Sequence, residues 1–121
     1  MYEPIRTKSV HTMADTAQYP HRSREEELDI QLAGHLSALL AVTDELGLEE
    51  AGDRIAREVA RLRGAAPVRH AELSGAGADA LHRRAHALAG RTLVVAASRA
   101  DTGVAILAAE RMDAHALVEA A

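Results

Sequence analysis

Apolar residues recur at helical spacing in two segments that follow one another directly along the chain. A spacing of three or four residues places such side chains on one side of an α-helix. Gly47 separates the segments and Gly64 ends the second, as helix-stopping glycines do. So short a link predicts an antiparallel helical hairpin. The stripe of the first helix is Leu28, Leu32, Leu36, Leu39 and Leu46, and that of the second is Leu48, Ile55, Val59 and Leu62.

Two further helices are predicted after a connector, residues 65–77, that contains Pro67 and two glycines. One runs from Ala78 to about Arg99, and the other runs from Thr102 to Ala120 with Asp101 as its N-cap. The apolar run 92–97 leaves an alternative open, in which it forms a short strand of an α/β fold. The favoured prediction is an all-α protein: a small four-helix bundle made of a helical hairpin plus two further helices.

The start of the chain lacks this periodicity. Residues 1–22 are expected to form an extended N-terminal arm, and residues 23–121 the helical bundle domain. Within residues 1–22 the basic groups outnumber the acidic ones by one, whereas the remainder of the chain is acidic. A short basic segment with apolar anchors suits strand addition to a partner protein or insertion into its groove. The candidate partner-binding residues are Ile5, Arg6, Lys8, Val10 and Met13.

Composition narrows the functional classes. A chain of 121 residues forms one domain, and the lack of Cys excludes disulfides and thiolate metal sites. The net charge of −4 and the acidic residues between the arginines argue against nucleic acid as a partner. No apolar stretch is long enough for a membrane span, so a cytoplasmic protein is expected. Thirteen Arg against one Lys, with 27 Ala, is typical of a bacterial genome rich in GC.

The last predicted helix is apolar on two sides. Val104, Ala108, Met112 and His115 fall on one face, whereas Ile106, Ala109 and Leu117 fall on another. A helix with two apolar faces is normally packed between two neighbours. A four-helix bundle offers this helix only one such neighbour, so its second apolar face is expected to be a subunit interface. The sequence therefore predicts a homodimer or larger homo-oligomer with Ile106, Ala109 and Leu117 in its interface.

Two histidines stand one helical turn apart on the third predicted helix. Side chains four residues apart project from the same side of a helix, so His82 and His86 are able to share a divalent metal ion. Such a site needs a third ligand, and the candidates are His35, Glu110, Asp113 and His115. The alternative is that both imidazoles lie at the edge of the apolar face and bind neighbouring polar groups. No cofactor is predicted apart from this metal.

The segment Ala85–Gly90 offers a second interpretation of His86. It resembles the phosphoacceptor motif of histidine phosphotransfer domains, which are helical bundles with an exposed histidine on a mid-chain helix. The resemblance implies that His86 accepts a phosphoryl group, with Arg83 and Arg84 nearby. It covers about six residues, and Ala89 stands where that family has a lysine.

No arrangement of residues in the chain is typical of a catalytic site. The motif G-x-S-x-G is absent, and the Gly-rich run at Ser74–Gly77 lacks the lysine of a P-loop. The expected function is therefore non-enzymatic: an oligomeric protein-interaction or regulatory module that binds itself and a further protein. The alternative is a histidine site on the third helix, which binds metal or carries phosphate.

Overall fold

Four α-helices build the part of the chain that the structure describes. The computed structural model describes residues 22–70 and 72–120, with side chains described as far as residue 116. The helices are α2 (Arg24–Glu45), α3 (Glu49–Arg63), α4 (Ala78–Arg99) and α5 (Thr102–Ala120). The all-α prediction is confirmed. The alternative strand at 92–97 is wrong, because these residues continue α4 and bury Thr92 and Ala96 at helical spacing.

The chain ends each helix where local chemistry favours it. The Ser23 side chain accepts a hydrogen bond from the Glu26 amide, and the Glu26 carboxylate accepts one from the Ser23 amide, which together form a capping box. Asp101 Oδ1 accepts the amide hydrogen of Val104 at 3.2 Å, so it caps α5 as expected. Gly64 closes α3 in the left-handed conformation, with φ of 74°.

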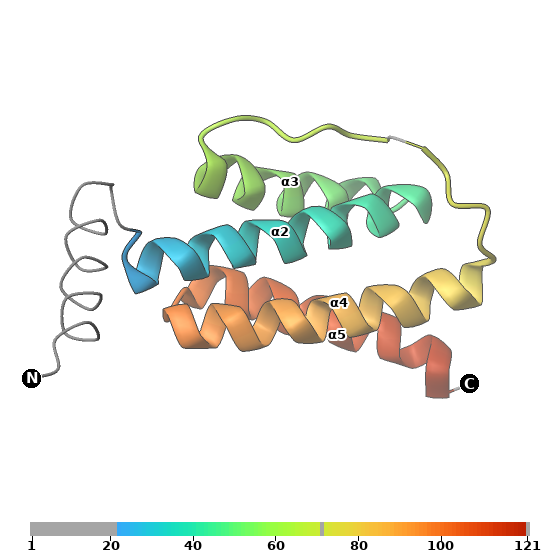
Figure 1. Cartoon of the computed structure of the whole chain (residues 1–121). Helices are drawn as coiled ribbons and strands as arrows, with labels where there is room; N and C mark the ends of the chain where they lie inside the picture. The colour runs from blue at the N-terminus through green and yellow to red at the C-terminus, as the bar shows by residue number, and fades with distance from the viewer. Residues whose placement is uncertain (1–21, 71, 121) are drawn as a thin grey trace, which may run out of the picture.

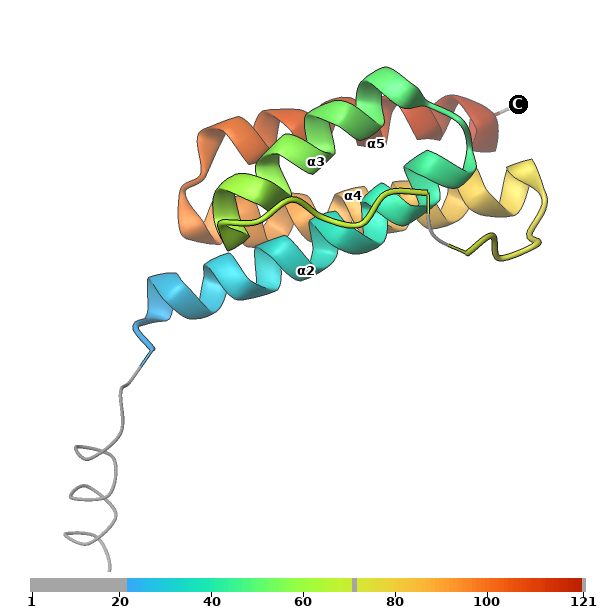
Figure 2. The same ribbon diagram turned by 90° about the horizontal axis from the view of Figure 1, so that it is seen from above.

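The helices form two antiparallel hairpins, α2–α3 and α4–α5 (Figure 1). The connector between the two hairpins is long because it runs back along the bundle before α4 begins. As a result, α3 and α4 run in the same direction (Figures 1 and 2). α4 packs against both α2 and α5, while α3 packs against α2. Among the described residues, no helix is long and apolar enough to cross a membrane.

The core is aliphatic and thin, as a chain without Phe or Trp requires. Leucines from α2 fill its centre, and Ile55 and Val59 of α3 close one side. The contact between α4 and α5 relies on small buried side chains, which allow two helices to approach closely. These are Ala85, Ala89, Ala96 and Ala108, together with the larger Val104 and Leu107.

Candidate functional site

His82 of α4 and His115 of α5 lie close together at the end of the α4–α5 hairpin that is opposite its turn. His82 Nδ1 lies 2.8 Å from His115 Nδ1, a hydrogen-bonding distance. The His115 side chain is buried, with 1% of the residue surface exposed. Its other ring nitrogen, Nε2, lies 3.2 Å from Nη2 of Arg111. Two of the predicted site residues, His82 and His115, are thus in direct contact across the helix interface.

The partners of His115 decide which of its nitrogens carries the proton. A guanidinium can only donate, so Nε2 of His115 accepts from Arg111 and the neutral ring carries its hydrogen on Nδ1. That hydrogen is donated to Nδ1 of His82, which leaves the hydrogen of the His82 ring on Nε2. A proton added to His115 would sit on Nε2 and face the guanidinium, so this arrangement favours the neutral ring.

Burial is the main cause of the shifted pKa values of His115 and Arg111. Burial, with smaller contributions from the charges of Arg111, His82 and His86, lowers the pKa of His115 to about 4. Burial also lowers the pKa of Arg111, and the nearby Arg54 adds to the effect. His115 is therefore neutral at pH 7, in agreement with its hydrogen bonds.

His86 has a different partner. Its Nδ1 lies 3.1 Å from the backbone carbonyl oxygen of Met112 in α5. A carbonyl only accepts, so Nδ1 carries the hydrogen and Nε2 keeps its lone pair. The side chain is partly exposed, and the exposed Arg83 precedes it by one helical turn. The contact with Met112 thus orients His86 with Nε2 as its nucleophilic atom.

The remaining candidates for metal ligation lie elsewhere or have other partners. Glu110 pairs with Arg54 at 2.6 Å, Asp113 is exposed, and His35 is a partly exposed residue of α2. The described residues contain no group of three or more His, Asp or Glu side chains arranged to hold a metal ion. The metal site at His82 and His86 stays a prediction, and the contact that the structure shows for His82 is a hydrogen bond.

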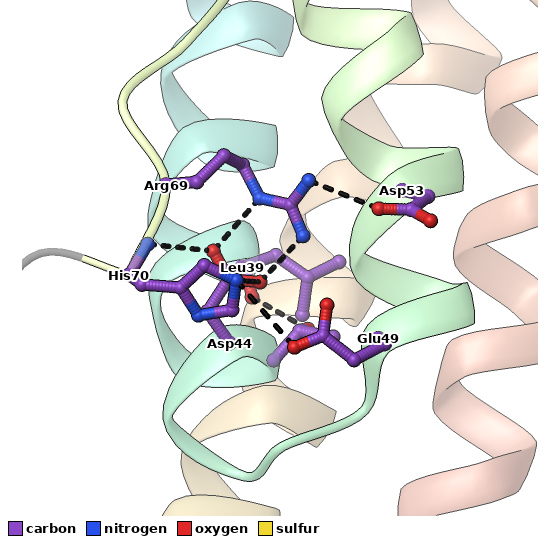
Figure 3. Close-up of polar contacts among 7 residues, drawn as sticks. Leu39, Asp44, Glu49, Asp53, Arg69 and His70 are labelled. Atoms are coloured by element: carbon purple, nitrogen blue, oxygen red, sulfur yellow. Dashed lines mark hydrogen bonds and ion pairs between the residues drawn. The ribbon is translucent and has the colours of Figure 1, made fainter.

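The most extensive polar network lies elsewhere, where the connector crosses the first hairpin (Figure 3). Arg69 donates two hydrogen bonds to the buried carboxylate of Asp44, at 2.8 and 2.9 Å, and a third to Asp53 at 3.1 Å. The amide of His70 also donates to Asp44. The Arg69 hydrogen bonds, more than the other contacts, lower the pKa of the Asp44 carboxyl. We call Asp44, Asp53, Arg69 and His70 the connector clamp.

Sequence reasoning missed the connector clamp. Its one local signal is Gly52, a glycine inside a helix. A Cβ at that position would lie 2.6 Å from Nη2 of Arg69 and 2.7 Å from Oδ1 of Asp44, so only glycine leaves room for the pair. The connector clamp thus holds the connector on the α2–α3 hairpin through a tertiary ion pair between Arg69 and Asp44.

A shallow apolar groove opens beside the turn between α4 and α5. It has a volume of about 380 Å³, and alanines form most of its wall. Ile106 stands at this groove with 55% of its surface exposed, and Ala109 lies one turn further along α5. Two predicted interface residues therefore share one exposed face. We call this surface the hairpin groove; its lining residues are Ala96, Ala97, Ala100, Asp101, Thr102, Ala105, Ile106 and Ala109.

Other predicted binding residues fall outside the description. The arm residues Ile5, Arg6, Lys8, Val10 and Met13 lie outside the described part of the chain. Leu117 belongs to α5, but its side chain also lies outside the described residues. Of the three predicted interface residues, the structure thus describes the side chains of Ile106 and Ala109.

Comparisons with protein-family models, with curated proteins and with solved structures find no match to this chain. Two features of the described chain bear on function: the histidine cluster, which consists of His82, His86 and His115, and the hairpin groove. The first offers an oriented nucleophile at His86. The second offers an apolar surface exposed to solvent.

Proposed function

We propose that this chain is a non-enzymatic helical module that binds a protein through the hairpin groove. The observation that carries the proposal is Ile106, a large apolar side chain that is 55% exposed beside a concave surface of alanines. Val94, which is 66% exposed, is a further exposed apolar side chain of α4, one helical turn before Ala97. Exposed apolar patches of this kind on small proteins commonly mark interaction sites.

Charge around the groove indicates the chemistry of the partner. Asp101 at the groove pairs with Arg61 at 2.7 Å. Arg99, two residues before it, pairs with Asp29 at 3.0 Å. Glu110 likewise pairs with Arg54. Each of these charges has a partner within the protomer, and Arg61 is shared with Glu58 at 2.8 Å, so the groove favours an apolar surface over a strongly charged peptide.

Site-specific photo-crosslinking tests this proposal. The full chain is produced in cells with a photoreactive amino acid at position 106 or, as the matched control, at position 30. Ile30 is also an exposed isoleucine, 49% exposed, but it lies on α2. Covalent adducts to protein at position 106 that are weak or absent at position 30 are expected. Equal adducts at both positions, or none at position 106, would contradict the proposal.

One observation favours a second candidate function, phosphoryl transfer to His86. The hydrogen bond to the Met112 carbonyl leaves Nε2 of His86 with a lone pair. Arg83, one turn away, supplies positive charge for a phosphoryl group. In such a transfer Nε2 forms a bond to phosphorus, while the bond between phosphorus and the leaving group of the donor breaks.

A small phosphoryl donor tests this second candidate. With phosphoramidate, nitrogen Nε2 takes the phosphoryl group and the donor nitrogen leaves as ammonia. We expect an acid-labile phosphate on the wild type and on His35→Gln, detected by mass spectrometry, and none on His86→Gln. An unmodified wild type, or a His86→Gln protein modified to the same extent as the wild type, would exclude His86 as the acceptor.

A further inference from the structure

We propose that the protein surface bound by the hairpin groove is a second copy of this chain, related to the first by a twofold axis. This inference rests on the proposed function, because it concerns the same groove. In a twofold contact each copy presents the same patch, so the patch must be complementary to itself. The hairpin groove meets this condition, because it combines a projecting side chain with a concave floor.

The projecting side chain is Ile106, and the floor is built from small residues. Ala97 of α4 and Ala100, the C-cap of α4, line the groove together with Ala105 and Ala109 of α5. A twofold axis close to Ile106 lets the isoleucine of each copy enter the groove of the other. Both isoleucines then leave water, and dense packing of this kind is what stabilises an apolar contact.

Electrostatics favours a second copy over a charged partner. A twofold axis brings each charged group close to its own equivalent, so a groove with unbalanced charge would repel itself. Here Asp101 is paired with Arg61, which also binds Glu58 at 2.8 Å, and Glu110 is paired with Arg54. Thr102 is the one other polar residue in the lining, and it is uncharged. Each carboxylate at the rim thus has a counter-ion within its own copy, which reduces like-charge repulsion between two copies.

The size of the groove sets the strength of the contact. Its lining covers Ala96–Ala100 on α4 and Thr102–Ala109 on α5. At about 1.5 Å per residue, the α5 part is about 12 Å long. Two such short helix faces bury less area than a standard protein interface, which takes about 800 Å² from each partner. We therefore infer a weak, reversible dimer with a Kd between about 1 µM and 1 mM.

Sedimentation velocity on the full chain measures this equilibrium. From about 1 µM to about 1 mM the average mass should rise from 12.9 kDa towards twice that value. Ile106→Lys should raise the Kd at least about 30-fold, because two isoleucines leave the contact and two ammonium groups face each other. Ile30→Lys makes the same change on α2 and should leave the Kd unchanged. A constant mass of 12.9 kDa, or equal effects of both variants, would overturn the inference.

The crosslinking experiment separates failure of this inference from failure of the proposed function. An adduct at position 106 with twice the mass of the chain supports the second copy. Adducts at position 106 with other proteins alone overturn the second copy and leave the proposed function standing. The absence of any adduct there overturns both.

A single-cysteine variant tests the position of the axis. The natural chain contains no Cys, so Ile106→Cys introduces one thiol per copy. A disulfide forms only when the two Cβ atoms come within about 4.5 Å. Ile106→Cys should therefore form a covalent dimer on mild oxidation faster than Ile30→Cys does. Equal rates for the two variants would overturn a twofold axis at Ile106.

Discussion

Mild acid should destabilise this protein through His115. The ring is buried between α4 and α5, with Arg111 at one nitrogen and His82 at the other. A second proton on the ring would place an imidazolium against a guanidinium inside the bundle. In the unfolded chain the same ring is hydrated and accepts a proton readily. The perturbation is therefore a decrease in pH, and the quantity that responds is the free energy of unfolding.

The two pKa values of His115 give the magnitude. The ordinary pKa is 6.5 and the folded pKa is about 4. Between these values the unfolded chain binds a proton that the folded chain does not bind, so lowering the pH favours unfolding. At about 1.4 kcal/mol per pH unit, the gap amounts to about 3 kcal/mol. This stability is complete above about pH 6.5 and is lost progressively as the pH falls to about 4.

Urea unfolding followed by far-UV circular dichroism measures this loss, because the chain has no Trp to report it. The informative variant is His115→Gln, whose amide accepts from Arg111 and donates to His82 but does not titrate. Between about pH 7 and pH 4 the wild type should lose about 3 kcal/mol more than this variant. His35→Gln is the matched control and should keep the wild-type dependence.

Equal losses in the wild type and His115→Gln would refute the reasoning, because they would show that His115 titrates normally in the folded protein. Protonation of Asp44 in the connector clamp does not affect this comparison. The pKa of Asp44 is lowered from 3.8, so the stability it contributes is present above that value and is lost only at lower pH.

Three further predictions concern stability. Asp44→Ala removes two of the three hydrogen bonds of Arg69 and the one from the His70 amide, and should cost about 2 kcal/mol in urea unfolding, a discounted value since Arg69 is 25% exposed. An unchanged midpoint would show that the connector clamp is dispensable. Gly52→Ala should destabilise the protein despite the better helix propensity of Ala. Gly34→Ala, whose Cβ meets no described atom within 4 Å, should instead stabilise it by up to about 1 kcal/mol. Shifts of the melting temperature in the same direction for both variants would contradict the close approach at Gly52. Asp101→Ala loses the cap of α5 and the pairing with Arg61 and should lower stability by about 1–2 kcal/mol, while an unchanged melting temperature would contradict the cap.

The helices could be predicted from sequence because their signals are local. The leucine stripe of α2, the capping box at Ser23 and the stop at Gly64 each act within a few residues. Even the ambiguous run 92–97 follows the same period once α4 is seen to bury Thr92 and Ala96. The path of the connector has no such signal. It depends on Arg69 reaching Asp44, 25 residues earlier in the chain, and on the space that Gly52 leaves.

For the candidate sites, the sequence identified several of the residues but not the contacts. Helical spacing placed His82 and His86 on one side of α4, and His115 was one of four candidates for a third ligand. The structure brings His82 and His115 together, but as a hydrogen-bonded pair whose geometry depends on Arg111. Which nitrogen points at which partner follows from the packing of α4 on α5, and no residue pattern along the chain encodes it.

Ion pairs between the two hairpins connect the fold to the proposed interface. α3 contributes Arg54 and Arg61 to acidic groups at α5, and α2 contributes Asp29 to Arg99 of α4. Pairs with this much exposure add about 0–1 kcal/mol each, so the apolar core provides most of the energy that docks the hairpins. Their larger effect is on specificity, because each places a counter-ion beside a charged group close to the hairpin groove. Arg61→Gln should therefore alter self-association more than folding, because it leaves the Asp101 carboxylate of each copy without its counter-ion at the proposed twofold contact.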